Sequence, residues 1–239
     1  MFTLDNIVAG YAETTVLRGV SLTVPDGSVV ALLGANGAGK TTLLRVASGL
    51  LRPTSGTMTL DGIDVTGHRP HQLAGRGVCH VPEGRGIFRR LSVRENLVVQ
   101  AGGHHQPPPR QTTARAAVDR AAGLFPVLGR RLDQQAGTLS GGEQQMLALA
   151  RAFVTDAPLI LADELSMGLA PVIVDQIFDA VGVLRSEGRS VLLVEQYVER
   201  AVGVADYVYI LNKGRVVFTG LPAECSSSAV FARYLQGAA

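Results

Sequence analysis

Residues 34–41 have the types and spacing of a phosphate-binding loop. They match the pattern G-x-x-x-x-G-K-[ST] in full, between an apolar run and a helical pattern. Glycines let backbone N–H groups surround a phosphate without a side-chain clash, lysine neutralises phosphate charge, and a threonine hydroxyl ligates Mg²⁺. The alternative is a glycine-rich turn that binds nothing, and the full match in this context argues against it. We expect a nucleotide-phosphate site formed by Gly34, Ala35, Asn36, Gly37, Ala38, Gly39, Lys40 and Thr41.

Two adjacent carboxylates, Asp163 and Glu164, end an apolar run that begins at Leu159. The end of a strand beside a phosphate loop is where ligands bind in parallel sheets. At such a place Asp163 suits Mg²⁺, and Glu164 suits a general base that polarises an attacking water. The alternative is a solvated Asp-Glu turn after a core strand. The upstream phosphate loop favours the catalytic interpretation.

A third feature is the run Leu-Ser-Gly-Gly-Glu-Gln-Gln at residues 139–145, which opens a helical pattern. Ser140 is a good N-cap, and the glycines expose N–H groups to an anion at the helix start. The alternative is an ordinary capped helix. We interpret the run as a second phosphate-binding feature that contains Ser140, Gly141, Gly142 and Gln144.

The elements that must position these residues alternate between strand and helix. Residues 2–33 are rich in β-branched segments, and residues 93–152 favour helix, with a Pro/Gly-rich break at 102–109. Such alternation predicts a parallel sheet with crossover helices. The expected strands are 28–33, 57–61, 158–162, 190–194, 206–211 and 215–218, and the expected helices are 40–50, 171–186, 197–203 and 229–235.

Length and composition are compatible with one large α/β domain. The chain has 239 residues and a formal net charge of +2, which does not suggest a nucleic-acid binder. Its two cysteines, Cys79 and Cys225, have no neighbours at metal-ligand spacing and are typical of a reducing cytosol. Residues 1–7 have no apolar run, so no signal peptide is expected. Apolar runs fit buried strands, because a membrane helix needs roughly 20 apolar residues.

The motif order resembles that of the ABC ATPases, whose signature has the sequence LSGGQ, and the resemblance covers essentially the whole chain. It implies an ABC-type P-loop NTPase core with an N-terminal antiparallel β region and an inserted helical subdomain at about 93–152, all in one domain, 1–239. It also implies that ATP and Mg²⁺ are the cofactors and that Thr42 contacts the α-phosphate. Tyr11 matches the aromatic residue that stacks on adenine; the alternative is a strand tyrosine facing the core.

Some positions depart from the family pattern. Glu83 takes the place of the family's loop glutamine and still offers Mg²⁺ an oxygen. Gln196 takes the place of the switch histidine, and no histidine occurs after His105. Leu165 replaces the usual proline after the base, and Ala170 replaces the usual aspartate of the loop that crosses to the partner subunit.

Apart from Leu165, which is unusual within it, these departures resemble one branch, the ATP-binding subunits of high-affinity branched-chain amino-acid uptake systems. Close relatives of that branch serve urea and short amides. The segments that carry this resemblance are residues 81–85, 166–171 and 194–196, with residues 10–11 and 31–39.

Other candidate sites are weaker. His104 and His105 lack partner ligands and lie in the Pro/Gly-rich break, which favours an exposed loop over a metal site. Arg85, Arg89 and Arg90 suit either a contact with a partner or phosphate, or a solvated basic turn.

The expected function is ATP hydrolysis that energises an importer at the cytoplasmic face of the cell membrane. The implied partners are integral membrane permeases, a second copy or a related ATP-binding subunit, and indirectly a substrate-binding protein, but no nucleic acid. One alternative is a non-transport ABC ATPase, whose repair types carry a long coiled coil that would show heptads absent here. A small-molecule kinase would lack the run at 139–142.

Overall fold

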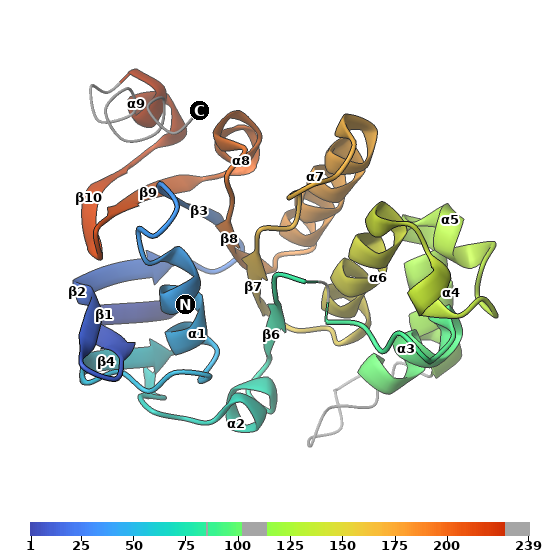
Figure 1. The fold of residues 1–239 in the computed structure, drawn as a ribbon, viewed down its shortest axis with the longest axis horizontal. Helices are drawn as coiled ribbons and strands as arrows, with labels where there is room; N and C mark the ends of the chain where they lie inside the picture. The colour runs from blue at the N-terminus through green and yellow to red at the C-terminus, as the bar shows by residue number, and fades with distance from the viewer. Residues whose placement is uncertain (85, 102–113, 228–239) are drawn as a thin grey trace.

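The computed structural model describes residues 1–84, 86–101 and 114–227. Two sheets form the β part of the molecule. Figure 1 shows the antiparallel sheet at one end and helices α3, α4 and α5 at the other, with β6 and β7 between them. The strands are β1 (Phe2–Tyr11), β2 (Thr14–Val24), β3 (Val29–Leu33), β4 (Ser55–Leu60), β5 (Ile63–Asp64), β6 (Val78–Val81), β7 (Leu159–Asp163), β8 (Ser190–Val194), β9 (Tyr207–Asn212) and β10 (Arg215–Gly220).

The larger sheet has the order β10-β9-β3-β8-β7-β6 and is parallel from β9 to β6. Strand β10 adds an antiparallel edge through a hairpin with β9. All residues of β3, β7 and β8 are buried, as expected for parallel strands covered on both faces. Along β3, alternate residues enter two different hydrophobic cores, one on each face of the sheet.

The smaller sheet is antiparallel, in the order β2-β1-β4-β5. It confirms the expected N-terminal antiparallel region, and the two sheets together confirm the expected P-loop NTPase architecture. Strand β4 follows the phosphate loop in sequence but pairs with β1, a choice that only long-range contacts decide.

Most helices match the predicted pattern. The helices are α1 (Lys40–Ala47), α2 (Pro70–Ala74), α3 (Val93–Ala101), α4 (Ala114–Leu124), α5 (Pro126–Gly129), α6 (Gly141–Val154), α7 (Pro171–Ser186), α8 (Val198–Val204) and α9 (Pro222–Ser227), with a 3-10 turn at Ala136–Thr138. The prediction of a helix to residue 50 was wrong, because α1 ends at Ala47 and Gly49 adopts a left-handed φ of 73°. The predicted helix 229–235 lies outside the described residues, as do His104, His105 and Arg85.

The sequence analysis missed β5, β6, α2 and α9. Of these, β6 matters most for the site, because it is the edge strand that leads into Glu83. It is only four residues long and gave too short an apolar run to recognise.

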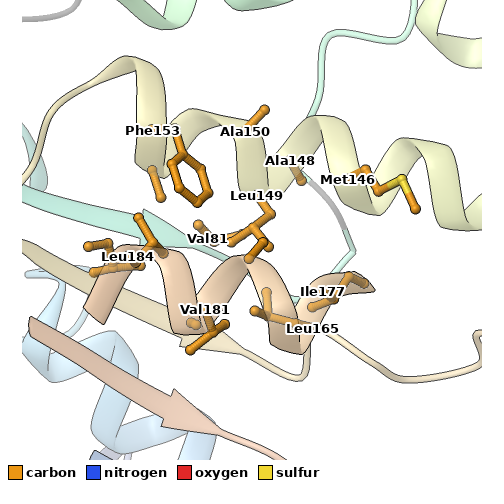
Figure 2. Close-up of a cluster of buried hydrophobic side chains, with 14 of the residues drawn as sticks. Val81, Met146, Ala148, Leu149, Ala150, Phe153, Leu165, Ile177, Val181 and Leu184 are labelled. Atoms are coloured by element: carbon orange, nitrogen blue, oxygen red, sulfur yellow. The ribbon is translucent and has the colours of Figure 1, made fainter. Parts of the chain in front are cut away.

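Helix α6 joins the helical region to the sheets. Its buried face packs on α7 and on Val81 of β6, as the cluster in Figure 2 shows. Leu165 is 1% exposed and lies in this cluster beside Ile177 of α7. The residue that replaces the family's proline therefore anchors the loop after Glu164 in the core.

Candidate active site

Four loops meet at one edge of the larger sheet because they follow parallel strands. They are residues 34–39 after β3, 82–84 after β6, 164–170 after β7 and 195–197 after β8. The carboxyl ends of parallel strands share an edge, and this is where ligands bind in open α/β sheets. The fold thus brings together segments that lie more than 150 residues apart in sequence.

A hollow of about 540 Å³ opens at this edge. It collects side chains from the phosphate loop, the loop after β6 and the two loops that hold Glu164 and Gln196. Its lining residues are Val16, Asn36, Gly37, Gly39, Lys40, Thr41, Thr42, Glu83, Glu164, Met167 and Gln196.

The phosphate loop has a backbone that only glycine tolerates at two points. Gly34 has φ 153°, and a Cβ there would lie 2.3 Å from the carbonyl oxygen of Leu211. Gly39 has φ 109°, a left-handed value, directly before α1. The Gly214 N–H donates to the carbonyl of Ala38 at 2.9 Å, so the turn between β9 and β10 contacts the phosphate loop and supports it.

Lys40 is the first residue of α1 and is 4% exposed. Its Nζ donates to the carbonyl oxygens of Gly34 at 2.8 Å and Ala35 at 3.3 Å, so the ammonium group lies across the loop. Burial lowers the pKa of Lys40, while the nearby carboxylates of Glu164 and Asp163 oppose this shift. The loop therefore holds a positive charge close to two acids.

Asp163 is the most unusual acid of the site. It is 3% exposed, and its Oδ1 is buried with no hydrogen-bond partner in the described part of the chain. Burial raises the pKa of Asp163 to about 6, and the charges of Glu164 and Glu83 add to this effect. A buried carboxylate oxygen without a donor is suited to a cation.

Glu164 follows with a left-handed backbone, φ 48°, which is a strained conformation for a residue other than glycine. Its N–H donates to the Val194 carbonyl at 2.9 Å, so the residue is held against the end of β8. Gln196 Nε2 donates to Glu164 Oε2 at 3.1 Å. The expected general base and the residue at the family's switch-histidine position, both of which we expect to take part in catalysis, are therefore in direct contact.

The signature run is built as a helix N-terminus. Ser140 is the N-cap of α6 and accepts from the Glu143 N–H at 3.3 Å, while Glu143 accepts from the Ser140 N–H at 2.8 Å. This capping box confirms the predicted cap. The Gln144 amide is 4% exposed and donates to the Leu139 carbonyl at 2.9 Å, so it supports the turn. A second hollow, lined by Gln144 among others, shares Glu83, Glu164 and Met167 with the first.

Tyr11 lies at the end of β1 and does not line the hollow. It is 41% exposed, so the alternative of a core-facing tyrosine is wrong. Its hydroxyl accepts from Arg45 of α1 at 3.1 Å, and the guanidinium lies 5.8 Å from the ring centroid. Ser140, Gly141 and Gly142 also lie away from the hollow, at the start of α6.

The sequence analysis gave no role to Glu195 and Ser166. Glu195 is 1% exposed, and its two carboxylate oxygens accept from the Ser166 N–H at 3.1 Å and the Ser166 hydroxyl at 2.5 Å. An acid directly after an apolar strand was the available signal, but nothing in the sequence showed that it is buried.

Comparison with known proteins identifies the family. The model of the family described as ABC transporter matches residues 17–166. The chain belongs to the ABC transporter family.

Two curated relatives cover nearly the whole chain. The high-affinity branched-chain amino acid transport ATP-binding protein BraG of Pseudomonas aeruginosa is 42% identical over 91% of both chains. The probable branched-chain amino acid transport ATP-binding protein LivF of Archaeoglobus fulgidus is 36% identical over 96% of this chain and 95% of its own. The lipopolysaccharide export ATP-binding protein LptB of Haemophilus influenzae is 34% identical, over 94% of this chain and 92% of its own.

Solved structures agree on the fold. An ABC transporter ATP-binding cassette in its ADP conformation matches with a TM-score of 0.86 and 25% identity, covering 98% of this chain and 97% of that one. A nucleotide-free cassette matches with a TM-score of 0.80 and 26% identity, covering 92% and 91%. This ABC ATPase is an ATP-binding subunit that couples ATP hydrolysis to transport. Another cassette of the same fold, 24% identical to this chain, is described as dimeric.

No helix in the described ranges is long and apolar enough to cross a membrane.

Proposed function

We propose that this ABC ATPase energises an importer of branched-chain amino acids, and that residues 1–239 form a single ATP-binding domain. The observation that carries the catalytic part is the hollow where Lys40 and Thr41 face the contacting pair Glu164 and Gln196. The similarity to BraG and LivF supports the substrate class. An importer of urea or short amides is the alternative within the same branch, and the lower identity to LptB makes lipopolysaccharide export a weaker candidate.

In this proposal the loop of residues 34–42 binds the ATP phosphates. Backbone N–H groups and the start of α1 supply partial positive charge, Lys40 neutralises the β- and γ-phosphates, and Thr42 contacts the α-phosphate. Tyr11 stacks on adenine. The contact with Arg45 keeps the ring close to α1 and so to the phosphate loop.

Glu164 is the proposed general base. Its carboxylate orients the attacking water and takes its proton, and the strained backbone fixes where that carboxylate points. Gln196 Nε2 holds Glu164 from one side, and its amide also suits a hydrogen bond to the γ-phosphate.

The residues present fit a Mg²⁺ ion. Asp163 offers an unpartnered carboxylate oxygen, Thr41 a hydroxyl and Glu83 a second carboxylate on the same side of the sheet. No cluster of three or more His, Cys, Asp or Glu side chains suited to a metal occurs in the described ranges. When bound, Mg²⁺ would neutralise charge that develops on the phosphates.

We propose that the run with Ser140, Gly141 and Gly142 binds the ATP held by a second ATP-binding subunit, with Gln144 supporting the turn. This explains why a helix start suited to an anion lies away from the hollow of its own chain.

The proposed permease contact is the segment after Glu83. Phe88 is 49% exposed there, and an apolar groove of about 280 Å³ lies beside Pro82. We propose that a short apolar segment of the permease binds in this groove. These contacts would hold the subunit at the cytoplasmic face of the membrane, and a separate substrate-binding protein would select the cargo.

Reconstitution with the permeases encoded by neighbouring genes tests the proposal. Uptake of labelled leucine that needs ATP is the expected result, with Lys40→Ala as the inactive control. Uptake of urea or an amide without leucine uptake would overturn the substrate assignment. ATP hydrolysis that never responds to any permease would overturn the transport role.

A further inference from the structure

A buried bridge lies directly behind the proposed catalytic pair. Glu195 is the first residue after β8, and Ser166 is the third residue after β7. Both are buried, with 1% and 0% exposure. The Glu195 carboxylate accepts from the Ser166 N–H and hydroxyl, so one carboxylate closes the gap between the two loops.

The bridge continues to both proposed catalytic residues. The Gln196 N–H donates to Glu195 Oε2 at 3.3 Å, and the Gln196 side chain donates to Glu164. Glu164 lies two residues before Ser166, so the contacts form a closed ring that runs through Glu164, Ser166, Glu195 and Gln196.

Burying a carboxylate needs a reason, because an acid in an apolar surrounding is costly unless it is hydrogen-bonded. Val194, the residue before Glu195, is a buried apolar residue, and Leu165 already anchors the loop after β7 in the core. An apolar residue at position 195 would preserve the packing of the core. It could not accept the hydrogen bonds that Glu195 receives from the N–H and hydroxyl of Ser166 and from the N–H of Gln196. Burial raises the pKa of Glu195 to about 7, although these hydrogen bonds oppose the shift. Burial of the charged carboxylate therefore carries a free-energy cost.

We propose that Glu195 is a positioning residue for ATP hydrolysis, which acts with Ser166 to hold Gln196 and Glu164 in their mutual geometry. The inference rests on the proposed roles of those two residues. Glu195 reaches the reaction only through them, since it does not line the hollow. Misplacement of reacting groups by about 1 Å costs on the order of 100-fold in rate.

The test compares Glu195→Gln, Ser166→Ala and Ser166→Thr with the wild type in the assembled transporter. Glu195→Gln replaces one acceptor oxygen by a donor that faces Ser166. We expect kcat to fall about 10- to 100-fold in Glu195→Gln and Ser166→Ala, with KM for ATP unchanged. Ser166→Thr keeps the hydroxyl and should retain most of the activity. Glu199→Gln, the same chemical change on the exposed face of α8, is the matched control and should be neutral.

Measuring Glu195→Gln in a Gln196→Ala protein as well as in the wild type distinguishes a positioning role from a purely structural one. If Glu195 acts through Gln196, then Glu195→Gln should cost much less in a Gln196→Ala protein than in the wild type. A purely structural role predicts the same loss in both backgrounds, and that outcome would overturn the proposal, as would wild-type kcat in Glu195→Gln. If Glu195→Gln does not fold, the contrast between Ser166→Ala and Ser166→Thr decides.

The same experiments distinguish this inference from the proposed function. Glu164→Gln is measured in parallel. Full turnover in Glu164→Gln would contradict the assignment of Glu164 as the general base. The coupling between Glu195 and Gln196 is measured from their single and double variants and does not depend on that result.

Discussion

At the residue scale, the site combines groups that are individually ordinary but are held in unusual surroundings. Asp163 is buried, with an oxygen that has no hydrogen-bond partner among the described residues, and Glu164 has a strained backbone. The Lys40 ammonium group lies across the phosphate loop. None of these properties belongs to the amino-acid type. Each follows from the place of the residue at the carboxyl edge of a parallel sheet.

Glu164→Gln tests the general base. The amide keeps the shape and can still contact Gln196, but it cannot take a proton. ATP should still bind, and turnover should fall by roughly 10²–10⁴-fold. Equilibrium binding of a fluorescent ATP analogue and steady-state phosphate release check the two parts. Wild-type turnover in the assembled transporter would reject the assignment.

Gln196→Ala tests the residue at the family's histidine position. Loss of the hydrogen bond to Glu164 should lower kcat through poorer positioning. An amide does not titrate near neutrality, so this position should contribute no ionisation to the pH profile of turnover. A transition near pH 6.5, the usual pKa of histidine, that vanished in Gln196→Ala would contradict this view.

At the element scale, the ends of β7 and β8 act as one unit. Backbone pairing runs to Asp163 and Val194, and the Glu195–Ser166 bridge continues it beyond the last ladder residues. Leu165 anchors the same loop in the cluster between α6 and α7. The two loops are therefore held against each other and against the core.

The bridge predicts a pH-dependent stability. Burial, reinforced by the charge of Glu164, raises the pKa of Glu195 from 4.5 to about 7, although its hydrogen bonds oppose this shift. Between these values the folded chain keeps a proton that the unfolded chain has lost, so stability falls as pH rises. Relative to Glu195→Gln, the wild type should lose up to about 3 kcal/mol of unfolding free energy between pH 4.5 and 7.

Urea unfolding of both proteins across this pH range measures the difference. Glu199→Gln is the control and should follow the wild-type curve. Parallel curves for the wild type and Glu195→Gln would show that folding does not raise the pKa of Glu195.

At the scale of the whole molecule, two anion-binding features lie apart. The phosphate loop opens into the hollow with Glu164, while the Ser140 helix start lies outside that hollow. We propose that two copies related by a two-fold axis bring each Ser140 run to the other copy's phosphate loop. In this proposal the subunit is incomplete alone, and ATP closes two subunits together.

Mixing two defective proteins tests this arrangement, provided that the chain homodimerises. Lys40→Ala cannot hold the phosphates, and Gly141→Asp places a carboxylate against the γ-phosphate. Each should be inactive alone. With random mixing half the dimers are mixed, so about a quarter of all sites are intact if sites form between chains.

Phosphate release should therefore recover in part on mixing, if one intact site suffices for turnover. If each site lay within one chain, every site would carry a defect, and mixing would restore nothing. Two controls are needed: native mass spectrometry must show mixed dimers, and a mixture of wild type and Lys40→Ala must show that one intact site suffices. If both hold and mixing restores no activity, the shared-site proposal is wrong.

The sequence by itself determined the features whose information is local. The spacing at 34–41, the acid pair 163–164 and the cap at Ser140 each lie within eight residues, and their order along the chain resembles one family. Tertiary structure decided the rest. It brought Glu83 to the site after β6, a strand too short to recognise in the sequence. It also placed Gln196 in contact with Glu164 and buried Glu195 in a hydrogen bond with Ser166. Those contacts depend on burial and on strand order in a parallel sheet, which bring distant residues together and leave no periodic signal in the chain.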